Sequence, residues 1–185
     1  MISVLLVSLV FAQTQPTSSS ATYRNLFKIS PSQFTRNTFQ MDFEHFISPI
    51  TSFQINAGMI YKDADYSRLW GVQVEGQFKF HVFTQINPRD SHRLYFAPYI
   101  QSQEIQSENQ SYTGTLTSTE NFSTISTGVL FGWSFSFANR INLDIYTGGG
   151  IKKSFNSKSS YYAGIWDYGY SGITPRLGID VGFWF

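Results

Sequence analysis

The closing stretch of the chain limits the possible folds more than any other segment. Residues 177–185 read LGIDVGFWF, in which apolar residues recur at every second position. This period of two predicts a β-strand with one apolar face, because successive side chains of a strand point to opposite sides. The apolar positions are Leu177, Ile179, Val181, Phe183 and Phe185. Trp184 breaks the alternation, and its parity predicts that it faces the other way.

The same period recurs along most of the chain, in segments separated by polar or turn-forming residues. Residues 70–82 alternate most regularly, over more than the roughly five or six residues of an ordinary strand. A tilted membrane crossing takes about 9–11 residues plus its ends. The expected strands are residues 22–30, 38–47, 51–62, 70–82, 93–102, 121–135, 141–152 and 173–185. Eight strands in an up-and-down order put both chain ends on one side of a barrel.

The connections between these segments alternate in length. The even-numbered connections are short turns. The last two odd-numbered connections, residues 103–120 and 153–172, are expected to be long loops. Outer-membrane barrels place their short turns in the periplasm and their longer loops outside the cell. Residues 31–37 predict an irregular connection. Pro98 predicts a weak point in its strand, because proline donates no ladder hydrogen bond.

The strand that ends in Phe185 and the repeated alternating segments resemble those of the small eight-stranded bacterial outer-membrane β-barrels of the OmpA and OmpX type. The resemblance implies an all-β fold, an eight-stranded antiparallel up-and-down transmembrane β-barrel, over residues 22–185. It implies integral insertion in the bacterial outer membrane with both termini in the periplasm. Expected partners are outer-membrane lipid, lipopolysaccharide and the barrel-assembly machinery. The signal read by that machinery would be Leu177, Ile179, Val181, Phe183 and Phe185.

The beginning of the chain predicts export. Residues 2–11 are almost wholly apolar, and Val-Phe-Ala ending at Ala12 fits a signal-peptide cleavage site. We therefore expect a signal peptide over residues 1–12 and a flexible lead over residues 13–21. No Lys or Arg precedes the apolar run, so a buried N-terminal helix or strand is the alternative. No other apolar run reaches the roughly 18–20 residues of a membrane helix, so we expect strands to cross the membrane.

Composition excludes several classes of function. Charged residues make up 14% of the chain, against a usual share of about 25%, and aromatic residues make up 18%. The net charge of +1, without a basic run, gives no electrostatic footprint for nucleic acid. The absence of cysteine excludes disulfides, thiolate metal sites and thiol nucleophiles. We expect no cofactor.

The residue types on the two faces decide which face points outward. A soluble lipocalin-like barrel would keep its apolar face inside around a ligand and would need a charge-rich outer face. The polar face here is built mainly from Gly, Ser, Gln and Asn, which suit a narrow lumen. The apolar face carries aromatic residues near its strand ends, like the aromatic girdles of membrane barrels. We therefore expect the apolar face to point toward lipid.

On this assignment the lumen holds charges of both signs. The acids are Asp42, Glu44, Glu75, Asp144 and Asp180, and the bases are Arg24, Lys28, Lys79, Arg93 and Arg176. Unpaired charges there would be costly, so we expect a network of ion pairs that fills the interior. An ion path is the alternative, but an eight-stranded barrel is just wide enough for its own side chains.

Other candidate sites carry weaker signals. The histidines, His45, His81 and His92, lack HxH or HExxH spacing, so interfacial or packed imidazoles are expected rather than a metal site. Residues 148–150 are three glycines that predict a close approach in the barrel wall. A possible external binding loop contains the aromatic residues Tyr161, Tyr162, Trp166, Tyr168 and Tyr170. Aromatic residues near lysines suit a protein partner or lipopolysaccharide headgroups.

These features predict a non-enzymatic structural or interaction barrel. One form of that role is an accessory subunit of an envelope complex, with a further envelope protein as its partner. The alternatives are a narrow pore or small-ligand transporter, and a lipid-modifying outer-membrane enzyme. The known lipid-modifying barrels use His and Ser groups near the outer leaflet, whereas the three histidines here fall at the expected periplasmic ends of strands.

Overall fold

The computed structural model describes residues 24–64, 67–86, 90–110, 116–137, 140–155 and 170–185. Eight strands and one short 3-10 helix make up this part of the chain. The strands are β1 (Asn25–Ile29), β2 (Thr38–Ser48), β3 (Thr51–Ala64), β4 (Ser67–Ile86), β5 (Ser91–Gln110), β6 (Leu116–Phe137), β7 (Ile141–Phe155) and β8 (Gly172–Trp184), and the helix is η1 (Pro31–Arg36). Among the described residues, no helix is long and apolar enough to cross a membrane.

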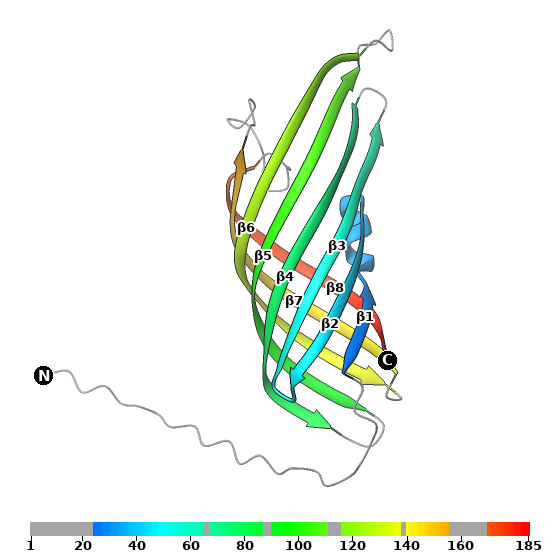
Figure 1. Cartoon of the computed structure of the whole chain (residues 1–185), viewed down its shortest axis with the longest axis vertical. Coiled ribbons are helices and arrows are strands. Elements are labelled where there is room, and N and C mark those ends of the chain that lie inside the picture. The colour runs from blue at the N-terminus through cyan, green and yellow to red at the C-terminus, as the bar shows by residue number, and fades with distance from the viewer. Residues whose placement is uncertain (1–23, 65–66, 87–89, 111–115, 138–139, 156–169) are drawn as a thin grey trace, which may run out of the picture.

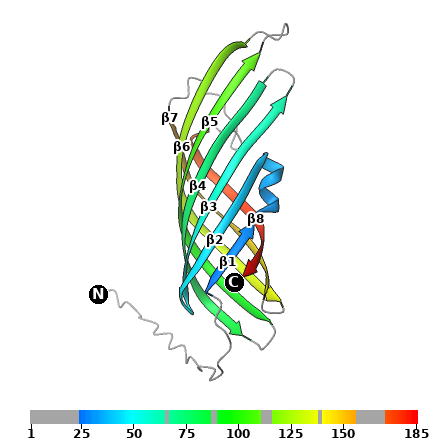
Figure 2. The ribbon, with the colours of Figure 1, turned by 45° about the vertical axis from the view of Figure 1, so that its right-hand side comes forward.

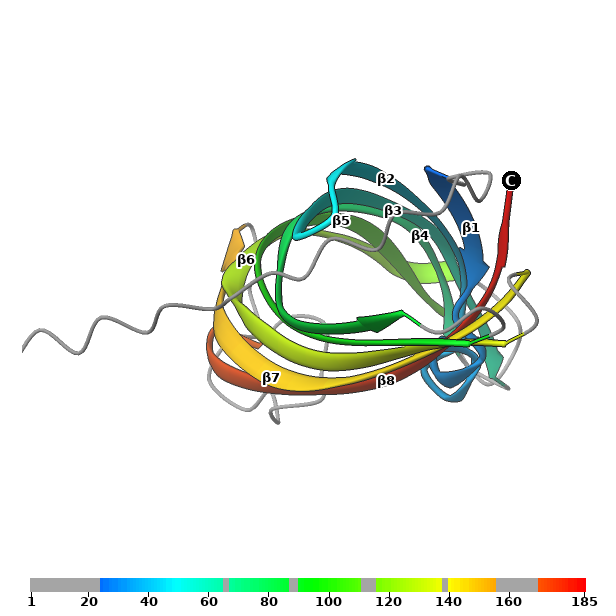
Figure 3. The ribbon, with the colours of Figure 1, turned by 90° about the horizontal axis from the view of Figure 1, so that it is seen from below.

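The sheet closes on itself. Each strand pairs antiparallel with the next, and β1 pairs with β8 through the register Leu26 to Trp184. The ring of strands is visible when the molecule is seen from below (Figure 3). β1 begins and β8 ends at the lower end of the barrel (Figure 1). The predicted all-β, antiparallel up-and-down fold with eight strands is confirmed.

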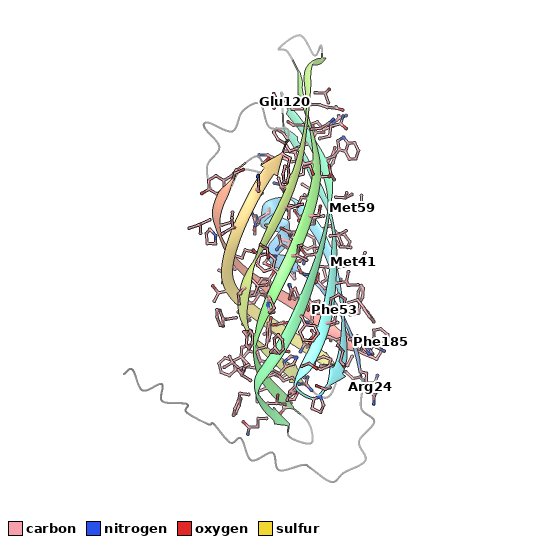
Figure 4. The ribbon with its side chains drawn as sticks, turned by 60° about the vertical axis from the view of Figure 1, so that its left-hand side comes forward. Arg24, Met41, Phe53, Met59, Glu120 and Phe185 are labelled. Atoms are coloured by element: carbon pink, nitrogen blue, oxygen red, sulfur yellow. The ribbon has the colours of Figure 1, made fainter. Side chains whose placement is uncertain are left out.

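Alternating side chains separate a polar interior from an apolar exterior. On β2, Gln40, Asp42 and Glu44 are buried in the barrel, whereas Met41 and Phe43 are exposed. Figure 4 shows side chains such as Met41, Phe53 and Met59 projecting from the outer face of the wall. The polar face is therefore the inner one, as its Gly, Ser, Gln and Asn content predicted.

The helix η1 lies where a longer β1 would have run. It packs between β2 and β8, directly after the short strand β1 (Figure 1). Pro31 occupies its first turn, where a missing N–H costs no helix hydrogen bond. The Ser32 hydroxyl accepts from the Ile179 N–H at 3.0 Å and donates to the Ile179 carbonyl at 3.3 Å. A side chain thus replaces part of the backbone ladder beside β8.

The wall of the barrel is higher on one side than on the other. The pairing of β6 with β7 begins only at Ser123, and the pairing of β2 with β3 reaches only Ile60. The upper parts of β3 to β6 pair with one another and rise above the other strands (Figures 1 and 2). We call these parts of β3 to β6 the upper sheet.

The prediction of a loop over residues 103–120 is wrong. Residues 103–110 continue β5, and β6 already begins at Leu116. The segment is rich in Ser, Thr, Glu and Gln on both faces, so it shows no apolar period of two. Its strands are formed by backbone pairing, which sequence patterning does not reveal. The expected loop over 153–172 is shorter as well, because β7 continues to Phe155; residues 156–169 lie outside the described residues.

Pro98 interrupts one ladder, as predicted. The pairing of β4 with β5 passes from Gln77 opposite Tyr99 to Phe80 opposite Phe96, with no pair between them in the described register. On its other edge Pro98 stays in register with Val129 of β6. A bulge follows between His81 and Phe83, where Val82 is the extra residue.

Tyrosines and glycines alternate across the strands β5 to β8. The register places Tyr95 opposite Gly132, Gly132 opposite Tyr146, and Tyr146 opposite Gly178. A Cβ added at Gly132 would overlap the Tyr95 ring, and one at Gly178 would overlap the Tyr146 ring. Each large inward side chain therefore lies flat over a neighbouring glycine.

The glycines of residues 148–150 also mark a close approach, as predicted. A Cβ at Gly148 would overlap the Val129 carbonyl, and one at Gly150 would overlap the Thr127 carbonyl. Both carbonyls belong to β6, so these glycines allow β6 and β7 to pack closely. The narrow lumen thus depends on small residues in the wall.

We expect Gly132→Ala to destabilise the barrel by about 1–3 kcal/mol, because the new methyl group must displace the buried Tyr95 ring. Gly76→Ala is the matched control: it is also a strand glycine, but its Cβ would meet only the Phe53 ring at 3.9 Å. Urea unfolding of both variants in detergent micelles measures the difference. Equal stability of the two variants would contradict the Tyr–Gly packing.

Candidate functional site in the barrel interior

Nine of the ten charged residues predicted for the lumen point into the barrel. Seven of their side chains are almost or completely buried: Lys28, Asp42, Glu44, Glu75, Lys79, Asp144 and Asp180. The Arg176 side chain is 8% exposed, and Arg93 is partly buried at the lower mouth. The prediction for Arg24 is wrong, because Arg24 is exposed at the lower end of the barrel, ahead of β1 (Figure 4).

Four charges of alternating sign form the centre of the network. The Lys28 Nζ lies 2.6 Å from Glu44 Oε2 and 2.6 Å from Asp144 Oδ2. The Lys79 Nζ contacts the same two oxygens, at 3.3 Å from Glu44 and 2.9 Å from Asp144. Each carboxylate is thus shared by both ammonium groups. We call Lys28, Lys79, Glu44 and Asp144 the central cluster; it joins β1, β2, β4 and β7 across the lumen.

Neutral polar groups complete the hydrogen bonding of the central cluster. The Tyr95 hydroxyl donates to Asp144 Oδ1 at 2.8 Å, and the Ser52 hydroxyl donates to Glu44 Oε1 at 2.5 Å. Lys28 donates a further hydrogen bond to Gln54 Oε1 at 3.1 Å. The Lys79 Nζ also lies 4.3 Å from the centre of the Tyr95 ring. These contacts meet the condition under which buried charges are tolerated.

A second ion pair lies higher in the lumen. Arg176 Nη1 is 2.6 Å from Glu75 Oε2. The other Glu75 oxygen accepts from Asn56 at 3.1 Å and from Gln77 at 2.7 Å. The Arg176 guanidinium also stacks over the Tyr99 ring, 4.5 Å from its centre. This pair links β4 to β8.

Aromatic rings surround Arg93 at the lower mouth. Its guanidinium lies 4.8 Å from the centre of the Phe46 ring and 5.1 Å from that of Trp184. The two rings are themselves 5.1 Å apart. Trp184 Nε1 donates to the Ser136 hydroxyl at 3.1 Å. Trp184 is buried, as its parity predicted, and it caps this mouth together with Phe46.

The histidines do not come together. His45 is exposed on the outside and bonds Asn25 Oδ1 at 2.8 Å, whereas His81 is buried and bonds the Ser52 hydroxyl at 3.0 Å. His92 packs edge-on against Phe135, with ring centres 5.5 Å apart. In the described part of the chain, no group of three or more His, Asp or Glu side chains is placed to hold a metal ion.

The predicted assembly residues all lie on the outer surface. Leu177, Ile179, Val181, Phe183 and Phe185 are exposed along β8 and its end. Of the predicted external binding loop, Tyr161, Tyr162, Trp166 and Tyr168 lie outside the described residues. Tyr170 is described, and its ring lies beside Gly172.

Sequence reasoning missed several residues of the network. Tyr95 and Tyr99 face inward between apolar neighbours that face outward, and this parity was the available signal. Ser30 shares the inward parity of Lys28 at the end of its segment, and this parity was again the available signal. Ser30 contacts two of the predicted carboxylates.

Chemically, the interior resembles a packed core made of polar groups. The charges of the central cluster are matched by one another, and their remaining hydrogen-bonding positions are occupied. Such an arrangement stabilises a fixed position of the strands. Comparison with protein-family models and with curated proteins gives no match for this chain, so no family assignment supplements the geometry.

We expect Asp144→Asn to destabilise the barrel by about 3–5 kcal/mol, because two buried ammonium groups would then share one carboxylate. Asp63→Asn is the matched control, since Asp63 pairs with Arg68 at 3.7 Å on the surface and should change stability by at most about 1 kcal/mol. Denaturant unfolding of both variants measures the effect. Combining Asp144→Asn with Lys79→Gln should recover part of the loss, and a strictly additive double variant would contradict the shared pairing.

Proposed function

We propose that this chain is an integral β-barrel of the bacterial outer membrane with a non-enzymatic, structural or interaction role. The observation that carries the proposal is the continuous apolar belt on the outside of a barrel whose interior is polar and charged. A water-soluble protein that exposed such a belt would aggregate, because soluble monomers rarely show apolar patches larger than a few hundred Å².

The belt carries no charged side chain along β3, β4 and β6. The outward positions from Phe53 to Tyr61 on β3, from Trp70 to Val82 on β4 and from Ile125 to Phe137 on β6 include no Asp, Glu, Lys or Arg. Most of the large apolar side chains at these positions are exposed, and Phe78, Phe80 and Phe135 are half-buried. Hydrocarbon would cover them at no cost in hydrogen bonds.

Aromatic residues gather toward the ends of the belt. On the lower outer surface, the ring centres of Phe80 and Phe96 lie 4.8 Å apart, and those of Trp133 and Phe135 lie 4.6 Å apart. Tyr61 and Trp70 are opposite one another farther up the wall. Aromatic rings at two levels, with aliphatic residues between them, suit the two interfaces of a bilayer.

The upper sheet supports an interaction role. Above the belt it carries polar and charged residues, among them Lys62, Arg68, Glu104 and Glu108. In the described residues its outer strands β3 and β6 lack a neighbour along their upper edges. Such a surface suits contact with another component of the envelope, for which this barrel would serve as an accessory subunit.

The packed lumen weighs against the pore alternative. The central cluster and the Glu75–Arg176 pair cross the interior at two levels, and Trp184 covers the lower mouth. We expect purified protein in planar bilayers to show no stepwise conductance under conditions in which it keeps its compact, heat-modifiable form on gels. Reproducible channel openings would favour the pore or transporter instead.

Tryptophan quenching tests the orientation of the wall. We expect lipids brominated in their acyl chains to quench a variant that retains only Trp133, which is 49% exposed on the outer face. A variant that retains only Trp184, which is 6% exposed and faces inward, is the matched control and should be quenched far less. The other tryptophans are replaced by Phe in each variant. Equal quenching of the two variants, or none, would contradict membrane insertion in this orientation.

A further inference from the structure

Ser30 joins two carboxylates where β1 ends. Its hydroxyl oxygen lies 2.8 Å from Asp42 Oδ2 on β2 and 2.6 Å from Asp180 Oδ1 on β8. All three side chains are buried, with at most 1% exposed. Below this level β1 separates β2 from β8, and above it η1 takes that place. The Ser30 bridge therefore lies at the point where the closure of the barrel changes from strand pairing to side-chain contacts.

Counting hydrogens shows that the bridge requires an extra proton. A serine hydroxyl has one hydrogen, so Ser30 can donate to Asp42 or to Asp180 but not to both. Oxygen–oxygen distances of 2.6 and 2.8 Å are those of hydrogen bonds, and each needs its own hydrogen. The second hydrogen must come from a carboxylic acid group that donates to the Ser30 oxygen.

The amide of Gln40 cannot provide that hydrogen. Its Nε2 donates to Ser30 Oγ at 3.0 Å and to Asp42 Oδ1 at 2.7 Å, which uses both of its hydrogens. Its Oε1 accepts from Gln73 at 2.8 Å, and this contact sets the orientation of the amide. With the amide reversed, its oxygen would lie 2.7 Å from Asp42, and that contact would require a proton on Asp42. The need for a proton holds in both orientations.

The charge balance of the interior points the same way. Five carboxyl groups are buried there, and the basic side chains among them, from Arg93 up to Arg176, are Lys28, Lys79, Arg93 and Arg176. Glu44 and Asp144 contact the two lysines, and Glu75 contacts Arg176. Within the described residues, no basic group lies within ion-pair distance of Asp42 or Asp180. One proton on these two residues makes four negative charges against four positive ones.

Within the part of the chain that the structure describes, the surroundings of Asp42 and Asp180 supply no further positive charge to balance two carboxylates. Lys28 on β1, Lys79 on β4 and Asp144 on β7 are the charged groups that act on it from neighbouring strands. Both lysines are already matched by Glu44 and Asp144. Tyr146, also on β7, interacts electrostatically with Asp180. Full negative charges on both Asp42 and Asp180 would thus repel each other between β2 and β8.

We propose that Asp42 and Asp180 hold one proton between them at neutral pH, through Ser30, and that this proton keeps β2 and β8 together beyond the end of β1. Loss of the proton leaves two carboxylates on either side of one hydroxyl and loosens the closure of the barrel. The site is a proton-dependent latch. It does not depend on the proposed function, because it follows from contacts inside the barrel.

The sign of the pH effect follows from the proton count. An aspartate in an unfolded chain has a pKa of about 3.9, so at pH 7 the unfolded protein has lost a proton that the native latch retains. Stability must then fall as the pH rises, and the unfolding equilibrium constant increases about tenfold per pH unit for one proton. The increase ends where the native latch has also lost its proton.

The test compares isosteric amides. Asp180→Asn keeps the shape of the protonated acid and needs no proton, so its unfolding constant should lack the tenfold rise per pH unit between pH 6 and 9 and should be lower than that of the unaltered protein at pH 9. Asp63→Asn, at the exposed pair with Arg68, is the control: it should keep both the stability and the slope of the unaltered protein. The converse result, with Asp180→Asn retaining the slope and destabilised as much as Asp144→Asn, would overturn the latch.

Infrared spectroscopy tests the proton directly and covers the case in which one variant fails to fold. The unaltered protein at pH 7 should show the carbonyl stretch of a protonated carboxylic acid, shifted in D2O. Asp42→Asn or Asp180→Asn, whichever folds, should lose that band. Absence of the band from the folded, unaltered protein at pH 7 would overturn the proposal even if neither variant folds.

Discussion

Two lysines and two carboxylates at the centre of the lumen connect strands that are far apart in the sequence. Lys28 and Asp144 belong to β1 and β7, and Glu44 and Lys79 belong to β2 and β4. The four groups can be buried only together, because removing any one leaves an unmatched charge in a site without water-like screening. The relative position of the strands around the lumen is thereby tied to the pairing of these charges. In a barrel of this width, that pairing takes the part that an apolar core takes in a soluble domain.

The small glycines in the barrel wall and the large side chains in the lumen fit together around the central cluster. Tyr95 reaches Asp144 because its ring lies flat over Gly132, and a larger residue there would leave no room for the ring. The same relation between Tyr146 and Gly178 repeats one strand farther on. The glycines in the wall thus leave the space that the large polar residues occupy in the lumen. This relation explains why so many glycines occur in strands, where they would otherwise weaken the sheet.

The barrel is not closed in the same way all around. Between β2 and β8, the short β1 gives strand pairing from Asn25 to Ile29, and the Ser30 N–H adds a backbone hydrogen bond to the Gln40 carbonyl of β2 at 3.2 Å. Beyond it, the side chains of Ser30 and Ser32 complete the join to β8. Side-chain closure allows dependence on protonation, which backbone hydrogen bonds do not have. On the other side the upper parts of β3 to β6 rise as the upper sheet. The outer belt and the upper sheet together support the proposal of a membrane barrel that presents a polar surface above its apolar one.

The alternating apolar pattern predicts the number of strands, their order and the face on which each alternating residue lies. Those features follow from the period of two, which is a local property of any strand. It also placed Asp42, Glu44, Asp144 and their partners in the lumen, because parity alone decides inside from outside once the apolar face is assigned. Of the charges named for the lumen, parity failed for Arg24, which precedes β1 and is exposed at the lower end of the barrel although its carbonyl accepts from the Phe46 N–H at 2.8 Å.

How these residues combine depends on contacts that form in the folded barrel. Register and closure, which depend on pairing between distant segments, set which base meets which acid and brought Ser30 between Asp42 and Asp180. The extension of β5 and β6 through residues 103–120 likewise depends on backbone pairing between two polar segments, for which no apolar period exists. The sequence pattern predicts which face of the sheet a residue occupies. It does not predict contacts across the lumen, because those contacts depend on the curvature of the whole sheet. Parity is set by neighbouring residues in the chain, whereas strand pairing joins distant segments, and the contacts across the lumen depend on that pairing.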